Sequence, residues 1–473
     1  MSLGSGAHRS TRRAALAGGG ALTLVPAAAC APGGGGGPAA TPADLSRVRQ
    51  PVLVWGPTGA AELPARQAQL AVFGAEHPNL PAEVVPAPFT SAQGVEGMQK
   101  LFAAVAAGDP PEAAWIDRFQ LANLAVRRTV ASVDAQLKRD RYDLKRHFAP
   151  LLEEVTGIDG KIYGLPSSTD NRALWWNKRQ LRESGVDAEK GPATWDDLRQ
   201  FATRATRSGG DDALTQLGWN FKSPGFGILY LWSWLAGAEF FARGGRTAQY
   251  DHPGVVEALN FLLAGADAQG GSARVDAFLA PGAQAGDPFV TDRIAMQLAS
   301  PLAAVARQRP DMDFGWGPVP VRRPGDRVQT FAGGFAWAVP AGTKNPEVSW
   351  AVLRSLLSEA ALSAWAEAGA GPARAGGGVY LPGFTTVEAT DRAFRQRFAT
   401  GIKTVDAAWD FTIDLMRFAR VRPVSPAAAE AWDGLSETWN TVLARKQTPK
   451  AACDALNVRV QRALDEAYSA ARA

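Results

Sequence analysis

The division of this chain is decided by the stretch DGKIYGLPSSTDNRALWWNK, residues 159–178. Its first part, through Pro166, predicts a segment that leaves one region of the chain, and the polar run 167–171 leads into another. The apolar run 173–178 predicts a strand, in which Trp175 and Trp176 point to opposite faces because side chains alternate along a strand. We therefore expect the chain to cross between two structural regions here.

Short apolar runs alternate with helical patterns on both sides of this crossing. Strands are predicted at 51–55, 83–85, 113–116, 296–300 and 331–340. Helical patterns run through Leu63, Leu70 and Phe73 up to Pro78, and from Gly94 to Ala106. Thr194 opens a helix with a capping box to Asp197, and Asn345-Pro346 caps another that carries Leu353. This alternation predicts an α/β fold.

Length and composition indicate a globular protein of more than one domain. The chain has 473 residues, of which 46% are hydrophobic and 20% charged, so two or three compact units are expected. The net charge of +4 falls to about +1 without the three arginines of residues 1–29, which argues against a nucleic-acid binder. Two cysteines exclude a disulfide scaffold and a cysteine-built zinc site. The 15 tryptophans against 6 tyrosines are unusual.

The N-terminus predicts an export signal and a lipid anchor. Arg12-Arg13 precedes the weakly apolar stretch 14–29, which is too short to span a membrane as a helix and resembles a twin-arginine signal. The run Ala27-Ala28-Ala29-Cys30 resembles a bacterial lipobox, which predicts lipidation of Cys30; a plain secretory signal with an incidental cysteine is the alternative. The glycine-rich segment 30–50 predicts a flexible linker, so the folded body is expected from Pro51.

Two residues are site candidates by position alone. Trp55 and Asp117 lie at the carboxyl ends of predicted strands, where ligands gather in open α/β sheets. Trp55 is equally compatible with a core position. Asp117 is also a candidate cap for the following helix.

Five motifs in order resemble the sugar-binding solute receptors of ABC importers, the group similar to maltose-binding protein (family 1). The segment DGKIYGLP with WWNK resembles the family's crossing, and PATWDDL at 192–198 resembles its helix start. The segments GGFAWAVP at 333–340 and KNPE at 344–347 resemble its paired-glycine region, and PAR at 372–374 and RPVSP at 422–426 resemble later markers. The resemblance runs from about Pro51 to the C-terminus.

The resemblance implies a two-lobe periplasmic-binding-protein-like fold (type II), with mixed sheets flanked by helices and a cleft between the lobes. One lobe is expected at 51–165 plus 325–375 and the other at 166–324 plus 376–465. It implies a monomeric carbohydrate receptor without enzyme activity, cofactor or metal. The expected partners are ABC permease subunits, and the expected location is the outer face of the cytoplasmic membrane, reached through the anchor.

Sugar sites pair flat aromatic faces with hydrogen-bonding side chains. For the aromatic faces the candidates are Trp55, Trp219 and Trp232, whereas Trp350, Trp365, Trp432 and Trp439 lie in helical patterns and are expected to pack. The polar candidates are Asp117, Asp170, Asn171 and Arg374, although the aspartates also suit turns and Arg374 also suits the surface. The paired-glycine segment adds Gly333, Gly334, Phe335 and Trp337.

Two departures from the family leave the identity of the sugar open. Where relatives carry stacking tryptophans, this chain has Ser300-Pro301-Leu302 and Phe335. The first alternative function is an exported hydrolase such as a glycosidase, although the chain has no nucleophile elbow, HExxH motif or P-loop. The second is a receptor of the same fold for a polyol, sugar phosphate, peptide or metal.

Overall fold

The computed structural model describes residues 44–57, 62–87, 98–210, 212–280 and 286–470. The predicted export segment 1–29, Cys30 and the start of the helix predicted from Gly94 lie outside these residues. The last part of the predicted linker is packed against the body: Leu45 is buried, and Asn79 Nδ2 donates to the carbonyl oxygens of Leu45 and Val48, both at 2.8 Å. The folded body therefore begins by Leu45 and not at Pro51.

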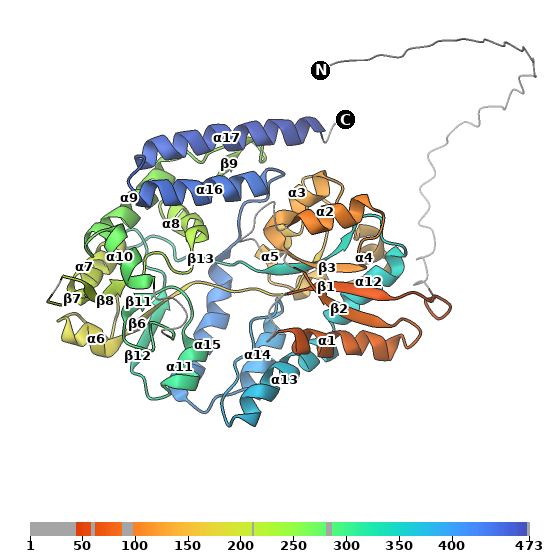
Figure 1. The fold of residues 1–473 in the computed structure, drawn as a ribbon, viewed down its shortest axis with the longest axis horizontal. Helices are drawn as coiled ribbons and strands as arrows, with labels where there is room; N and C mark the ends of the chain where they lie inside the picture. The colour runs from red at the N-terminus through yellow and green to blue at the C-terminus, as the bar shows by residue number, and fades with distance from the viewer. Residues whose placement is uncertain (1–43, 58–61, 88–97, 211, 281–285, 471–473) are drawn as a thin grey trace, which may run out of the picture. The chain divides into compact units, whose positions relative to one another are not determined.

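The first sheet has the strand order β2-β1-β3-β14-β4, with β5 also paired to β14. Its strands are β1 (Val52–Gly56), β2 (Ala82–Pro86), β3 (Ala113–Asp117), β4 (Val130–Ala131), β5 (Leu165–Pro166) and β14 (Phe335–Pro340). The β1–β2 and β1–β3 pairs are parallel, and β14 is antiparallel to each of its partners. Strand β14 thus returns to this sheet from far along the chain, as Figure 1 shows.

Seven of the described α-helices either connect or follow strands of this sheet along the chain or pack near it. They are α1 (Leu63–Glu76), α2 (Gln99–Ala106), α3 (Leu121–Val126), α4 (Asp134–Asp140), α5 (Ala149–Glu154), α12 (Pro346–Leu356) and α13 (Glu359–Ala375). Helix α13 packs along α1. Asn345 caps α12 as predicted, because its side chain accepts from the N–H groups of Glu347 and Val348.

The second sheet has the order β12-β6-β11-β8-β7. Its strands are β6 (Ala173–Asn177), β7 (Arg207–Ser208), β8 (Leu214–Trp219), β11 (Ile294–Gln297) and β12 (Phe314–Pro318). Trp175 and Trp176 of β6 lie in two different hydrophobic clusters, so the predicted alternation of faces is confirmed. Gly315 on the paired strand β12 makes room for Trp176, because a Cβ there would collide with the indole.

Most of the remaining α-helices that the structure describes lie in the second half of the chain. They are α6 (Lys178–Glu183), α7 (Trp195–Ala205), α8 (Leu229–Leu235), α9 (Pro253–Asp267), α10 (Ser272–Leu279), α11 (Leu302–Gln308), α14 (Glu388–Arg397), α15 (Lys403–Leu415), α16 (Ala428–Leu443) and α17 (Pro449–Ala470). The capping box predicted for α7 is present between Thr194 and Asp197. Helices α16 and α17 lie side by side (Figure 1).

The strand predicted at 331–340 is wrong as one element. Residues Thr330–Phe331 form β13, which pairs with β15 (Ala419–Arg420), and Phe335–Pro340 form β14 in the first sheet. The paired glycines lie between these two strands. Gly334 has φ +121°, and a Cβ there would collide with the carbonyl oxygen of Ser168. A second small ribbon pairs β9 (Phe241–Ala242) with β10 (Thr247–Ala248).

Candidate functional site: a cleft lined by aromatic and charged side chains

A cavity of about 670 Å³ opens beside the start of β14. That volume falls within the range of small-molecule sites. Helix α1 contributes Arg66 to the lining, β3 contributes Trp115 and the crossing segment contributes Asp170. Helix α11 adds Arg307, and the stretch from α13 to Phe384 supplies the remaining wall. The cavity therefore collects side chains from elements associated with both sheets.

Its aromatic wall is a stacked pair. The rings of Trp115 and Phe335 lie 3.7 Å apart at an interplanar angle of 12°. The pairing of β3 with β14 explains the contact, because Trp337 is opposite Trp115 and Phe335 is two residues away on the same face. The Trp115 indole N–H donates to Ser167 Oγ at 3.0 Å, which fixes the ring. Both residues are only partly buried and line the cavity, so part of the pair is accessible to a ligand.

The Arg66 guanidinium lies among these rings. Its Cζ is 5.3 Å from the ring centre of Trp115, 5.3 Å from that of Trp365 and 6.0 Å from that of Trp337. These distances are those of cation–π contacts. Nη1 donates to Gln69 Oε1 at 2.8 Å. Burial lowers the pKa of Arg66 to about 10, which leaves the side chain cationic at neutral pH.

Asp170 lies where this cavity meets two smaller ones of about 290 and 260 Å³, because it lines all three. One carboxylate oxygen lies 2.8 Å from Arg172 Nη1, and the other accepts from the Gly333 N–H at 2.8 Å. Desolvation opposes ionisation, but Arg172 and this N–H outweigh it and lower the pKa of Asp170. Half of the side chain is exposed. An ionised carboxylate thus faces the junction of three adjoining cavities.

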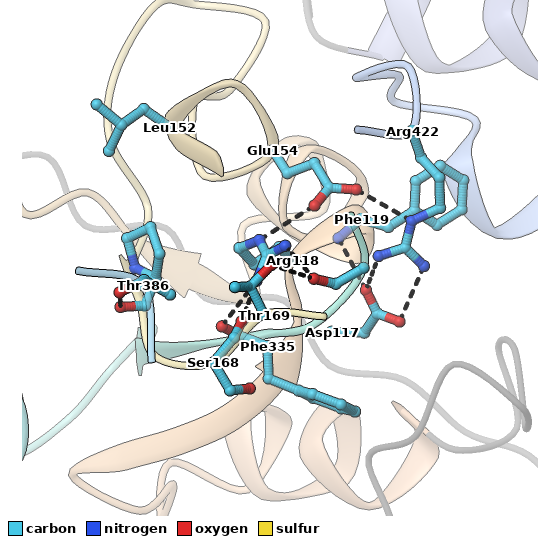
Figure 2. Close-up of polar contacts among 12 residues, drawn as sticks. Asp117, Arg118, Phe119, Leu152, Glu154, Ser168, Thr169, Phe335, Thr386 and Arg422 are labelled. Carbon is cyan, nitrogen blue, oxygen red and sulfur yellow. Dashed lines mark hydrogen bonds and ion pairs between the residues drawn. The ribbon is translucent and has the colours of Figure 1, made fainter. Parts of the chain in front are cut away.

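Asp117 belongs to a buried charge cluster next to the cavity of 290 Å³ (Figure 2). Arg422 donates to both of its oxygens, at 3.0 and 2.5 Å, and to Glu154 at 3.0 Å. Arg118 donates to the other oxygen of Glu154 at 3.1 Å. Two positive and two negative buried side chains therefore neutralise one another.

This cluster also holds the segments that line the cleft. Arg118 donates to the carbonyl oxygens of Ser168 and Gly333, each at 2.5 Å, as Figure 2 shows for Ser168. Arg422 follows β15 and joins the 419–426 segment to β3 and α5. The Asp117 carboxylate also caps the turn after β3 by accepting from the Phe119 N–H. Asp117 is therefore a positioning residue whose oxygens are already occupied.

The structure brings some of the predicted site residues to the cleft. The cavities are lined by Asp117, Asp170, Asn171, Gly333, Gly334 and Phe335. Asn171 faces the third cavity and donates to the Thr412 carbonyl at 2.6 Å. The Gly333 N–H donates to Asp170.

Other predicted site residues are placed elsewhere. Trp219, Trp232 and Trp337 are completely buried in hydrophobic clusters, so none offers a face for stacking in this conformation. Trp55 is buried in another cluster under Lys100, 4.5 Å from its ring centre. Arg374 is half-exposed on α13 and paired with Glu367 at 2.5 Å, outside the lining of the cavity. None of these five side chains therefore lines the three cavities described above.

Sequence reasoning missed several cleft residues. Arg66, Trp115 and Tyr380 carried no motif signal, and Trp365 and Trp432 were expected to pack in helices, yet all five line cavities. Trp115 had a usable signal, because it lies two residues before Asp117 and therefore shares a face of β3 with it. Arg66 had none, since its position in the cavity depends on α13 packing along α1.

Two properties of the described residues bear on other functions. No group of three or more His, Cys, Asp or Glu side chains among them could hold a metal ion. Over the same part of the chain, every helix is too short or too polar to cross a membrane.

The comparisons with known proteins agree on one family. The profile of the bacterial extracellular solute-binding proteins matches residues 56–362. A putative binding protein of Brucella abortus strain 2308 is 23% identical over 265 residues, which are 55% of this chain and 62% of the relative. The chain thus spans less than two thirds of that relative. The maltodextrin-binding protein MdxE of Bacillus subtilis is 23% identical over 316 residues, 65% of this chain and 68% of the relative.

Solved structures share the fold at low identity. The GacH receptor of Streptomyces glaucescens, solved unliganded and with acarbose, has a TM-score of 0.67 and 18% identity, covering 89% of this chain and 100% of that one. CpMnBP1 with mannobiose bound has a TM-score of 0.69 and 20% identity, covering 87% and 99%. These likenesses identify the fold as that of periplasmic solute-binding proteins. The family profile matches more than half of this chain, which therefore belongs to the bacterial extracellular solute-binding protein family.

Proposed function

We propose that this protein is a lipid-anchored extracytoplasmic receptor that captures a sugar or oligosaccharide between two closing lobes and delivers it to an ABC permease. The observation that carries the proposal is the cavity of about 670 Å³ with the stacked Trp115 and Phe335 in its wall and Asp170 at its junction. Sugars present apolar C–H faces and a rim of hydroxyls, so such a site matches them on both counts.

The two lobes are proposed to be 51–165 plus 325–375, extended back to Leu45, and 166–324 plus 376–465. Apart from Pro166 at the end of β5, all strands of the first sheet come from the first set of residues. All strands of the second sheet come from the other set, which supports this division. Periplasmic binding proteins close their lobes over a ligand by a hinge motion. A permease could then distinguish loaded from empty receptor by its shape.

Export and anchoring are proposed from the sequence at residues 12–30. Arg12-Arg13 and the lipobox-like Ala27–Cys30 support a twin-arginine lipoprotein signal. A maltooligosaccharide-binding relative from Streptococcus pneumoniae, 23% identical over 209 residues, is a lipoprotein. Several acyl chains on Cys30 would hold the receptor stably at the membrane.

The site is proposed to bind its ligand without catalysing a reaction on it. A glycosidase needs one carboxylic acid with a raised pKa to protonate the leaving group. Here Asp170 has a lowered pKa and is paired with Arg172, and Asp117 is held by two hydrogen bonds from Arg422. Neither carboxyl group is therefore suited to act as the acid, which supports a receptor over the hydrolase alternative.

Calorimetry on the full chain tests the proposal. The titrants are a panel of mono- and oligosaccharides, polyols, sugar phosphates and short peptides, and micromolar binding of at least one saccharide is expected. Native mass spectrometry of protein purified without added ligand provides a second readout. No saccharide binding in either experiment, or turnover of chromogenic glycosides, would overturn the proposal.

A further inference from the structure

Arg66 is a buried cation in the cavity of about 670 Å³, and no described carboxylate forms an ion pair with it. It lies in the first turns of α1 with 6% of its surface exposed. Within the described residues its one hydrogen bond is from Nη1 to Gln69, and Nε has no partner. No described carboxylate lies within ion-pair distance. The aromatic rings and, without an ion pair, Glu62 act on this charge. A buried cation without an ion-pair partner is still costly, so this arrangement favours the binding of an anion beside Arg66.

The other buried arginines of the cleft are fully compensated. Arg118 and Arg422 share Glu154, and Arg422 also holds Asp117. The chain therefore neutralises deeply buried guanidinium groups with its own carboxylates where no ligand is needed. Arg66 differs from both, and it is the one of the three that lines the cavity of about 670 Å³.

Tyr380 supplies a second donor, because it lines the same cavity as Arg66. Burial raises the pKa of Tyr380, so its hydroxyl stays protonated at neutral pH. Gly369 of α13 leaves room for that hydroxyl, because a Cβ there would collide with it. A guanidinium and a phenol hydroxyl in the wall of one cavity are both available as hydrogen-bond donors to a ligand.

The other charged side chains that line the cavity are paired or exposed, so Arg66 is the buried cation of its wall. Asp170 is neutralised by Arg172, and Arg307 is exposed on α11 at the cavity wall. Glu62, the remaining lining carboxylate, is exposed at the start of α1. One buried cation matches a single negative charge, which favours a carboxylate over a phosphate dianion.

We propose that the ligand is an acidic saccharide carrying a uronate carboxylate, which Arg66 and Tyr380 bind while the sugar ring packs on Trp115 and Phe335. This inference rests on the proposed function. Arginine binds carboxylates through parallel N–H groups, which suits Arg66 better than a neutral hydroxyl would.

Calorimetry with matched ligands tests the inference. Neutral oligosaccharides are compared with their derivatives oxidised to uronates at C6, and with the corresponding 6-phosphates, on the wild-type full chain. The uronate form is expected to bind at least about 10-fold more tightly than its neutral parent. Arg66→Gln is expected to weaken uronate binding on the order of 100-fold and to remove the preference. Arg199→Gln, at a half-exposed arginine of α7, is the control.

The outcomes separate the two proposals. Binding of neutral sugars equal to or tighter than that of uronates overturns this inference and leaves the proposed function standing. Tighter binding of the 6-phosphates overturns the choice of carboxylate. Absence of all saccharide binding overturns the proposed function itself. Because the ligand comparison uses the wild-type protein, it remains decisive if Arg66→Gln does not fold.

Discussion

Two groups of aromatic side chains in this protein use the same residue type in opposite ways. The core tryptophan group comprises Trp195, Trp219, Trp232 and Phe261. The cleft aromatic group comprises Trp115, Phe335, Trp365 and Tyr380. Trp232 meets Trp195 and Trp219 edge to face, with ring centres 5.7 and 5.5 Å apart. Trp195 and Phe261 of the core group also stack, 4.3 Å apart. In the cleft group Trp115 stacks on Phe335 and Trp365 faces Arg66, and what sets this group apart is that all four of its rings line a cavity.

The indole N–H groups of the core and cleft tryptophans also differ in their hydrogen bonding. The indole N–H groups of Trp195, Trp219 and Trp232 have no hydrogen-bond partner among the described residues. The indole N–H of Trp115 donates to Ser167. In the core group packing of rings decides the position, whereas in the cleft group a hydrogen bond and the Arg66 cation hold Trp115 at the cavity. An excess of tryptophan therefore indicates a sugar site only where the surrounding polar groups also fix the ring.

The largest effect is expected when the core group is broken. Trp232→Ala should lower the free energy of unfolding by about 3–5 kcal/mol, because it leaves a cavity among fully buried rings. Urea unfolding measures this loss. The affinity of the remaining folded protein for saccharide should change less than about 2-fold. A large loss of affinity with intact stability would show that Trp232 belongs to the site.

The cleft group should give the reverse pattern. Trp115→Ala is expected to weaken saccharide binding by about 2 kcal/mol, or roughly 30-fold, because it removes a platform held by Phe335 and Ser167. Calorimetry measures the affinity, and urea unfolding of the same variant provides the control. If stability falls as far as in Trp232→Ala while affinity is unchanged, the distinction between the two groups is wrong.

The sequence predicted the fold far better than it predicted the site. Caps and alternating strands are local, so the helix starts at Thr194 and Asn345 and the two faces of β6 could be predicted. Trp219 and Trp365 could not be assigned, because exposure at a cavity depends on which distant helix packs over the ring. Trp219 is covered by α9 through Phe261, while Trp365 of α13 faces α1 and Arg66.

A substitution of Asp170 tests the polar side of the cleft and is expected to have a smaller effect on stability. Asp170→Asn should cost about 1 kcal/mol of stability at neutral pH, a modest value because the ion pair with Arg172 is half-exposed. The folded-state pKa of Asp170 is lowered, so this stabilisation is present above the unfolded pKa of about 4 and is lost as pH falls through the folded value. Urea unfolding of both proteins from pH 7 to pH 2 should show the difference disappearing at the acid end.

The smallest effect separates two residues on one helix. Trp365 and Arg374 both lie on α13, but Trp365 lines the cavity and Arg374 is paired with Glu367 at the surface. Arg374→Ala should change stability by less than about 0.5 kcal/mol and leave saccharide affinity unchanged, because exposed ion pairs contribute little. Trp365→Ala should weaken binding measurably, since it removes a ring that faces Arg66 and lines the cavity for the ligand. Calorimetry on the two variants compares them directly, and equal losses of affinity would mean that α13 contributes through its position and not through Trp365.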